Sequence, residues 1–336
     1  MTITEMALLR RIRRRVPRVT GSGLLAGIGD DCAVFRAPVG EDLLYTTDLL
    51  IERVHFRRES LPARLVGRKA LARGLSDVAA MGGQPRFCLV SLALPMWADT
   101  RWVDSFYRGL AALAKETKTA VAGGDLSSAE QFVCDIVVGG SVPRGTAMLR
   151  DGARGGDGIY VSGALGGAAL GLRKGSGAAW QRHARPEPRL RLGTHLRKQG
   201  WVTSAMDLSD GLSLDLFRIC EASGVAAVVD RPLPVFPGAT LEDALHGGED
   251  YELVFTARAG ARVRRSFEGI PLTRIGAVVE SSTPRVEFFG RRLKPDGWDH
   301  FRGARPLRVS PPATGRKRPS PMGSSPDAGD PADEEA

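Results

Sequence analysis

The amino-acid sequence predicts an α+β (mixed α/β) protein of two domains, with helices on one face of its sheets. Three observations lead to this prediction. The chain has 336 residues, a length typical of about two domains. Its hydrophobic fraction of 43% is sufficient for ordinary hydrophobic cores. Short apolar runs typical of strands alternate along the chain with longer segments typical of helices.

The first half of the chain alternates between these two kinds of segment. The pattern predicts helices at about 4–16, 64–81 and 100–118, and strands at 43–47, 87–94, 119–122 and 132–142. The second helix is expected to end at Gly82 and Gly83, because glycine commonly closes a helix. The segment DGARGGDG at 151–158 consists of turn-forming residues and marks a boundary. We therefore expect a first domain over residues 1–148.

The second half continues with a similar mixture of elements. The pattern predicts strands at 159–162, 225–229, 251–256 and 274–279, helices at 166–173, 189–199 and 213–222, and a loop at 175–188. These elements are expected to form a second α/β domain over 149–306. Residues 307–336 are rich in Pro, Ser, Gly and charge, with almost no large apolar side chains. Such a segment cannot bury enough surface to order itself, so we expect a disordered tail without a catalytic role.

The net charge of +9 arises largely from arginine, and much of it is concentrated near the start of the chain. The arginines of this segment are Arg10, Arg11, Arg13, Arg14, Arg15 and Arg18. A basic helix can bind nucleic acid or an anionic surface. No stacking aromatic residues accompany it, and no nucleic-acid-binding motif follows. A solvated helix is therefore the favoured interpretation, and no nucleic-acid partner is expected.

The sequence also indicates a compartment. No stretch approaches the roughly 20 apolar residues of a membrane span, and no apolar run follows the charges near the start. The four cysteines are widely spaced and form no C-x-x-C pair, which argues against a zinc site and against a disulfide framework. We therefore expect a cytoplasmic protein without a membrane partner.

Six aspartates in short segments that contain glycine or serine carry the strongest functional signal. They are Asp31 in GIGDDCAVF, Asp48 in YTTDLL, Asp77 in GLSDVAAMGG, Asp125 in AGGDLSS, and Asp207 and Asp210 in MDLSDGL. All but Asp77 are expected where a strand gives way to a turn or helix. Six carboxylates gathered at strand ends would repel one another unless a cation held them, and hard oxygen ligands select Mg²⁺. Together they predict a phosphoryl-transfer site with several Mg²⁺ ions, although any one segment could simply mark a turn.

Missing motifs narrow the kind of phosphate site that the chain can build. There is no P-loop, no protein-kinase motif set, no nucleophile elbow, no dinucleotide fingerprint and no H-E-x-x-H zinc motif. The site must then consist of metal ions, backbone amides and arginines. Glycines in GGD at 123–125 and in SGALGG at 162–167 can offer backbone N–H groups to phosphate. Arg150 could clamp a phosphate, or it could be an ordinary surface residue.

The motifs, taken together and in order, resemble those of the thiamine-monophosphate kinases. The segments are GIGDDCAVF, TTDLLIERVHF, KALARGLSDVAAMGGQP, GGDLSS, MDLSDGLSLDL, GGEDYELVFT and GWDHF, which span roughly residues 24–301. This family is related to aminoimidazole ribonucleotide synthetase and selenophosphate synthetase. The resemblance implies a two-domain fold like that of aminoimidazole ribonucleotide synthetase. It also implies a homodimer, in which strands of the N-terminal ATP- and Mg²⁺-binding domain form a barrel-like interface with the partner.

The resemblance also implies roles for individual residues. The implied Mg²⁺ ligands are Asp31, Thr46, Thr47, Asp48, Asp77, Asp125, Asp207 and Asp210. Thr47 and Asp48 are expected to hold the same ion. The implied ATP contacts are Tyr107, Gly124, Asp125, Arg150 and Ser209, and the implied contacts to thiamine monophosphate are His55, Glu249 and Trp298. The family often has Tyr where this chain has Trp298, but either ring can stack on a thiamine heterocycle.

The implied reaction transfers a phosphoryl group from ATP to thiamine monophosphate and gives thiamine diphosphate, the last step of its biosynthesis. The acceptor phosphate has a second pKa of about 6, so it is largely dianionic at neutral pH and no general base is needed. The main obstacle is the repulsion between two anionic phosphates, which Mg²⁺ ions reduce. Two alternatives remain open: another ATP-dependent synthetase of the superfamily, and a basic nucleic-acid-binding protein.

Overall fold

A computed structural model describes residues 5–16, 23–29 and 31–298 of the chain. The tail expected at 307–336 lies outside these residues. The first part of the described chain contains α1 (Glu5–Arg15), β1 (Leu24–Ala26), β2 (Val34–Phe35), β3 (Glu41–Ile51), α2 (Ala63–Ala80), β4 (Gln84–Leu94), α3 (Thr100–Glu116), β5 (Ala120–Ser128) and β6 (Val133–Pro143). Within the described ranges, no helix is both long and apolar enough to cross a membrane.

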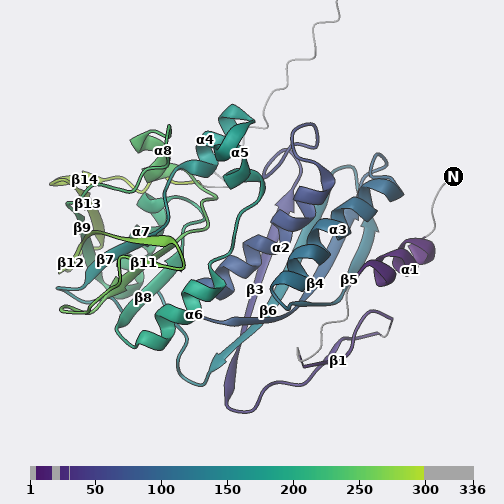
Figure 1. Ribbon diagram of the computed structural model, residues 1–336, viewed down its shortest axis with the longest axis horizontal. Coiled ribbons are helices and arrows are strands. Elements are labelled where there is room, and N and C mark those ends of the chain that lie inside the picture. Colours follow the sequence, from purple (N-terminus) through teal and green to yellow (C-terminus); the bar gives the residue numbers. More distant parts are fainter. Residues whose placement is uncertain (1–4, 17–22, 30, 299–336) are drawn as a thin grey trace, which may run out of the picture. The chain divides into compact units, whose positions relative to one another are not determined.

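Strands β3 to β6 form a four-stranded mixed sheet in the order β3-β6-β4-β5, so that β3 and β5 are its edges. The pairs β3–β6 and β4–β6 are antiparallel, and β4–β5 is parallel. Helices α2 and α3 lie side by side across one face of this sheet (Figure 1). The strand order thus places the two edges, which carry Asp48 and Asp125, far apart within one chain.

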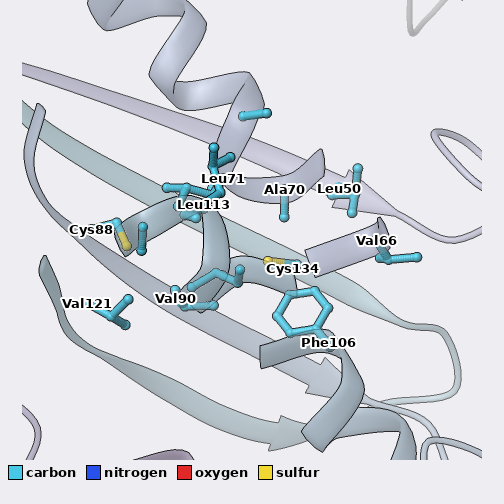
Figure 2. Packing of buried hydrophobic residues seen from close by; sticks show 14 of the residues in the cluster. Leu50, Val66, Ala70, Leu71, Cys88, Val90, Phe106, Leu113, Val121 and Cys134 are labelled. Carbon is cyan, nitrogen blue, oxygen red and sulfur yellow. The ribbon is translucent and has the colours of Figure 1, made fainter. Parts of the chain in front are cut away.

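Close packing of α2 on α3 depends on two glycines. A Cβ atom on Gly67 would lie 2.0 Å from the carbonyl oxygen of Phe106, and one on Gly109 would lie 1.7 Å from that of Arg64. No side chain fits at either position, so the backbones of the two helices can touch. Beneath them, Phe106 of α3 and Cys134 of β6 belong to the buried core between the helices and the sheet (Figure 2).

The second part of the described chain contains a larger sheet and five helices. Its elements are β7 (Gly158–Ser162), α4 (Gly167–Lys174), α5 (Gly177–Ala184), α6 (Leu190–Gln199), β8 (Val202–Asp207), α7 (Leu212–Ser223), β9 (Val225–Val229), α8 (Leu241–His246), β10 (Leu253–Ala257), β11 (Ser266–Phe267), β12 (Ile270–Glu280), β13 (Arg285–Phe288) and β14 (Arg291–Leu293). The strand order is β14-β13-β9-β12-β7-β10-β8, and β11 pairs with β12. A separate core that includes Ile159, Leu216 and Val254 stabilises this part.

The predicted helices and strands agree with most of these elements, but two expectations were wrong. The segment 175–188 is not only a loop, because it contains α5 at residues 177–184. This helix packs tightly on α4, where a Cβ on Gly171 would lie 2.1 Å from the carbonyl oxygen of Ala179. Such tertiary packing stabilises a short helix that has little helical signal of its own.

The second error concerns the positions of two aspartates. Asp48 and Asp125 do not lie where a strand ends, because β3 continues to Ile51 and β5 continues to Ser128. Polar residues at 46–48 and 123–125 suggested strand ends, but the pairing of β3 with β6 and of β5 with β4 continues through them. Asp207, in contrast, is the last residue of β8, as expected.

Candidate functional site

The helix-covered face of the first sheet carries one group of the expected ligands. Successive side chains of a strand point to opposite faces, so Thr46 and Asp48 share the face on which α2 packs. The hydroxyl of Thr46 donates a hydrogen bond of 2.5 Å to Oδ2 of Asp77, which lies on α2. The guanidinium of Arg73, one helical turn earlier, donates a bond of 3.1 Å to Oδ1 of Asp48. Strand β3 and helix α2 thus bring two of the expected aspartates into one environment.

Asp207 joins this group from the second sheet. Its side chain is buried, and its Oδ2 accepts a hydrogen bond of 2.7 Å from the hydroxyl of Ser76 on α2. Burial raises the pKa of Asp207 well above its ordinary value, and the charges of Asp77 and Asp48 raise it further. Three of the predicted carboxylates, from β3, α2 and β8, therefore lie close enough to influence one another's protonation.

Burial also raises the pKa of Asp48 to about 6, and that of Asp77 in the same direction. Buried carboxylates of this kind favour any cation that can compensate their charge. Their oxygen atoms suit Mg²⁺, which prefers hard ligands and keeps several waters. However, within the described ranges no three His, Cys, Asp or Glu side chains form a ready metal cage. The donor set fits Mg²⁺ in its chemistry, with water and substrate oxygens left to complete the coordination.

Arginines are the cations that hold two of the expected metal ligands in this structure. Arg73 pairs with Asp48, and Arg218 of α7 donates a hydrogen bond of 2.6 Å to Oδ2 of Asp210. Arg218 also donates to Asp215, whose Oδ2 accepts 3.0 Å bonds from the backbone N–H groups of residues 210 and 211. Asp215 is fully buried, and burial raises its pKa to about 7. These contacts fix the turn that presents Asp210.

A second group of expected site residues lies on the opposite face of the first sheet. There a cavity of about 1180 Å³ is lined by Asp31, Gly123, Gly124 and Asp125, among others, and Tyr107 of α3 reaches it from the core. Asp31 and Asp125 are exposed. A Cβ on Gly124 would lie 1.9 Å from the carbonyl oxygen of Val90, so only glycine fits there. The glycine-aspartate segment predicted to bind phosphate, which lies within β5, therefore faces a cavity.

Thr47 belongs to this second face and not to the face of Asp48. Its hydroxyl donates a hydrogen bond of 2.6 Å to Oδ1 of Asp135 on β6. The expectation that Thr47 and Asp48 hold one ion is therefore not supported by their side chains, which point to opposite faces. Asp125 is also remote from Asp48, because three strand spacings of about 4.8 Å separate the two sheet edges by roughly 14 Å. Within a single chain, the sheet divides the predicted ligands into two groups.

Residues expected to bind the acceptor gather around a buried lysine. The Nζ atom of Lys69, on α2, is fully buried and lies 2.8 Å from Oε2 of Glu249 and 3.5 Å from the carbonyl oxygen of His55. Nδ1 of His183 lies 3.0 Å from the same carboxylate oxygen. Burial alone would raise the pKa of Glu249, but Lys69, His183 and Arg73 outweigh it and hold that pKa below its usual range. The carboxylate of Glu249 is therefore ionised and fixed in place.

Backbone contacts place the remaining expected residues beside this carboxylate. The backbone N–H of Glu249 donates a bond of 2.8 Å to the carbonyl oxygen of Ser209, and that of Trp298 donates a bond of 2.9 Å to the carbonyl oxygen of Asp210. Trp298 is 42% exposed, so it is accessible to a ligand. Arg150 is exposed, and its charge acts to lower the pKa of Asp77. These contacts thus hold Glu249 and Trp298 at the turn that follows Asp207, and Arg150 lies near enough to Asp77 to influence it.

Comparisons with known proteins agree with this arrangement. Residues 29–142 match the family model of the AIR synthase related protein, N-terminal domain, and residues 154–288 match that of the C-terminal domain. The chain is 38% identical over 332 residues to the thiamine-monophosphate kinase of Escherichia coli (strain K12), with 90% of this chain and 99% of the relative covered. The chain belongs to the thiamine-monophosphate kinase family.

Solved structures of thiamine-monophosphate kinases share this mixed α/β two-domain fold. The enzyme of Stenotrophomonas maltophilia K279a superimposes with a TM-score of 0.75 at 36% identity, covering 87% of this chain and 99% of the other. A structure named "AaThiL complexed with AMPPCP and TMP" gives a TM-score of 0.72 at 33% identity, covering 90% of this chain and 99% of the other. The fold predicted from the thiamine-monophosphate kinase motifs is thus confirmed.

Several polar residues of this thiamine-monophosphate kinase site were not predicted from the sequence. They are Lys69, Arg73, Asp135, His183, Asp215 and Arg218. One signal for them is present on α2, where Lys69, Arg73 and Asp77 follow one another at spacings of four residues. Residues four apart lie on one face of a helix, so a polar stripe on this largely buried helix indicates a site.

Proposed function

We propose that this chain catalyses the ATP-dependent phosphorylation of thiamine monophosphate to thiamine diphosphate. The observation that carries the proposal is the convergence of Asp48, Asp77 and Asp207 from three elements, in a member of the thiamine-monophosphate kinase family. Such a group suits phosphoryl transfer because it can hold the cations that two anionic phosphates need. A relative whose structure contains AMPPCP, an ATP analogue, and TMP supports the two substrates.

Mg²⁺ is the proposed cofactor. Asp48, Asp77 and Asp207 with Thr46 would hold it on one face of the first sheet, and Asp31 and Asp125 on the other. When bound there, Mg²⁺ neutralises charge on the phosphate oxygens of both substrates. Asp210 would serve a further ion, at the turn fixed by Arg218.

The nucleotide and the acceptor are assigned to different residues. ATP would contact Gly124, Asp125, Tyr107, Arg150 and Ser209. Thiamine monophosphate would contact His55, Glu249 and Trp298, where an ionised carboxylate and an exposed indole ring suit the cationic heterocycle of thiamine. A first domain over 1–148 would then supply most nucleotide contacts, and a second over 149–306 would supply Glu249 and Trp298.

No side chain is required as a general base in this proposal. The acceptor phosphate is already largely dianionic near neutral pH. The side chains of the chain instead position the two phosphates in line and exclude water, which is how most of the barrier to phosphoryl transfer is lowered.

A homodimer is the proposed assembly. On the face of the first sheet opposite to α2 and α3, Tyr45 is 62% exposed and Leu49 is 50% exposed. A second copy would cover these apolar side chains, and it would bring carboxylates from another chain toward those of the first. The proposed substrates are metabolites of the cytoplasm, and neither a membrane nor a nucleic acid is a proposed partner.

The test is incubation of the purified protein with ATP, MgCl₂ and thiamine monophosphate, followed by chromatographic detection of thiamine diphosphate. We expect product to form only when all three are present. Precursors of aminoimidazole ribonucleotide are offered in a parallel reaction. Turnover of those precursors without turnover of thiamine monophosphate would assign the chain to a sister synthetase.

A further inference from the structure

The arginine-rich helix α1 has no role in the function proposed above, but the fold places it at the cavity that contains Asp31 and Asp125. Of its side chains, Met6, Leu9, Arg10, Ile12 and Arg13 line this cavity. They recur at spacings of three and four residues, so one face of α1 forms a wall of the cavity. Two cationic side chains, Arg10 and Arg13, therefore line the same cavity as the glycine-aspartate segment at 123–125 of β5.

Contacts on its other sides hold α1 in this orientation. Leu8 and Ile12 are buried in the core of the first domain. The guanidinium of Arg11 donates two hydrogen bonds to the carboxylate of Asp104 on α3, and Arg15 lies 3.6 Å from the same carboxylate. The arginines of α1 therefore fall into two pairs. Arg11 and Arg15 anchor the helix to α3, whereas Arg10 and Arg13 face the cavity.

Arg13 lies directly against the loop that carries Asp31. A Cβ on Gly29 would be 2.8 Å from Nη1 of Arg13, and Gly29 has a φ of +122° that side chains rarely adopt. Glycine at this position thus provides both the backbone conformation and the space that the guanidinium occupies. Among the residues that the structure describes, no carboxylate forms an ion pair with Arg10 or Arg13. Both guanidinium groups therefore line the cavity without a paired carboxylate from the described ranges.

We propose that Arg13, assisted by Arg10, binds the polyphosphate of the nucleotide in this cavity. The argument rests on the proposed function, which assigns Gly124 and Asp125 of the same cavity to ATP. The triphosphate of a nucleotide is a polyanion, and arginine presents a planar set of N–H donors that matches phosphate oxygens. The glycines at 123–124 of β5 let the ligand approach the backbone closely, and α1 supplies the positive charge.

A matched control is available on the same helix. Arg14 is exposed, is not among the residues that line the cavity, and forms no ion pair with another residue of the described ranges. Arg13→Gln and Arg14→Gln each remove one positive charge from α1, so they change the net charge of the protein equally. Only the first removes a charge from the cavity.

The experiment measures the binding of AMPPCP with MgCl₂ by isothermal titration calorimetry. We expect Arg13→Gln to weaken this binding about tenfold and Arg10→Gln,Arg13→Gln to weaken it further, whereas Arg14→Gln stays within about twofold of wild type. Affinity should also fall less steeply with NaCl in Arg13→Gln than in wild type. The KM for thiamine monophosphate should not change. Arg13→Lys keeps the charge and should recover part of the affinity. Such a recovery would show that the weaker binding of Arg13→Gln does not come from a folding defect.

Two results would overturn the proposal. Wild-type affinity of Arg13→Gln for AMPPCP would show that the cavity arginine does not contact the nucleotide. An equal loss in Arg14→Gln would show that only the diffuse positive charge of α1 matters, as for a helix that binds nucleic acid. Because nucleotide binding is measured without turnover, both results remain distinct from failure of the proposed kinase activity, which would appear only in the product assay.

Discussion

Nη2 of Arg73 lies 3.1 Å from Oδ1 of Asp48, and both side chains are largely buried, with 11% and 22% of their surfaces exposed. The Arg73 guanidinium is thus the cation that Asp48 meets in this structure. A buried charge that loses its partner is costly, so this pair offsets part of the cost of burying the Asp48 carboxylate. If Mg²⁺ binds Asp48 as proposed, the contact with Arg73 competes with it.

We predict that Arg73→Met makes the protein less stable without metal and more responsive to Mg²⁺. Loss of the guanidinium leaves Asp48 buried and unpaired, at a cost of about 3 kcal/mol. Mg²⁺ then has no competitor and stabilises the folded state more strongly. The measurement is the melting temperature over a series of MgCl₂ concentrations. Arg86→Met is the control, since Arg86 forms a comparable pair with Glu41 away from the proposed ligands. Equal Mg²⁺-dependent shifts in wild type and Arg73→Met would contradict the prediction.

The second prediction concerns the buried pair of Lys69 and Glu249. We expect Lys69→Met to destabilise the fold by about 3–5 kcal/mol, because it leaves the Glu249 carboxylate buried without its closest cation. Urea unfolding measures this loss. Lys69→Met combined with Glu249→Gln removes both charges and should recover much of the stability in a double-mutant cycle. Additive losses from the two substitutions would argue that the residues do not interact.

The third prediction concerns pH and Asp250, which is buried and accepts backbone hydrogen bonds from Gly166 and Ala168 at the start of α4. Burial raises its pKa from 3.8 to about 6, so the folded protein holds this proton more tightly than the unfolded chain does. Its stabilising contribution is present below about pH 4 and is lost as pH rises through about 6. Each pKa unit corresponds to about 1.4 kcal/mol, so the change from 3.8 to about 6 lowers the free energy of unfolding by about 3 kcal/mol at neutral pH.

Asp250→Asn should remove the pH dependence that Asp250 gives to the free energy of unfolding, because an amide does not ionise. The fold should persist, because the amide oxygen can still accept the hydrogen bond from Gly166. Free energies of unfolding measured between pH 4 and 7 should therefore decline less steeply in the variant than in wild type. Parallel curves for the two proteins would show that Asp250 titrates at the same pH in the folded and unfolded states.

The sequence could predict the ligand types and the fold, but not how the sheet divides the ligands. Aspartate motifs identify Asp77 and Asp207 as site residues, and α2 and β8 bring them together. The separation of Asp48 from Asp125 depends instead on the strand order β3-β6-β4-β5, which hydrophobic patterns do not encode. Pairing of strands distant in sequence is decided by tertiary packing, and so is the length of each strand.

The partners of the expected ligands were similarly difficult to predict. Arg73 is an ordinary helix-forming residue in the sequence, and its contact with Asp48 exists only because α2 crosses β3. Arg13 presents the same difficulty, since its proximity to Gly29 depends on how α1 packs through Leu8 and Ile12. The four-residue spacing on α2 indicates that Arg73 shares a face with Lys69 and Asp77, but the specific contacts of Arg73 and Arg13 are known only from the fold.

The last prediction tests whether His55 acts as a general base, a role that would contradict the base-free mechanism proposed above. The backbone N–H of Ile51 lies 3.0 Å from Nδ1 of His55. A backbone N–H can only donate, so Nδ1 must accept, and the neutral ring then carries its proton on Nε2. In this tautomer the Nδ1 lone pair is already engaged and Nε2 is a donor. His55 is therefore suited to donate a hydrogen bond to an anionic phosphate and is poorly suited to remove a proton from it.

We accordingly predict that His55→Asn raises the KM for thiamine monophosphate about tenfold and leaves kcat within a few-fold of wild type. This pattern is expected when a substitution removes binding that the ground state and the transition state share. A general base, in contrast, contributes typically 10²–10⁴-fold to the rate. Steady-state kinetics from pH 6 to 9 separate the two cases, with His195→Asn, distant in sequence and stacked on Phe267, as the control. A hundredfold fall in kcat at unchanged KM, with an altered pH profile in His55→Asn alone, would establish proton removal by His55 and refute the base-free mechanism.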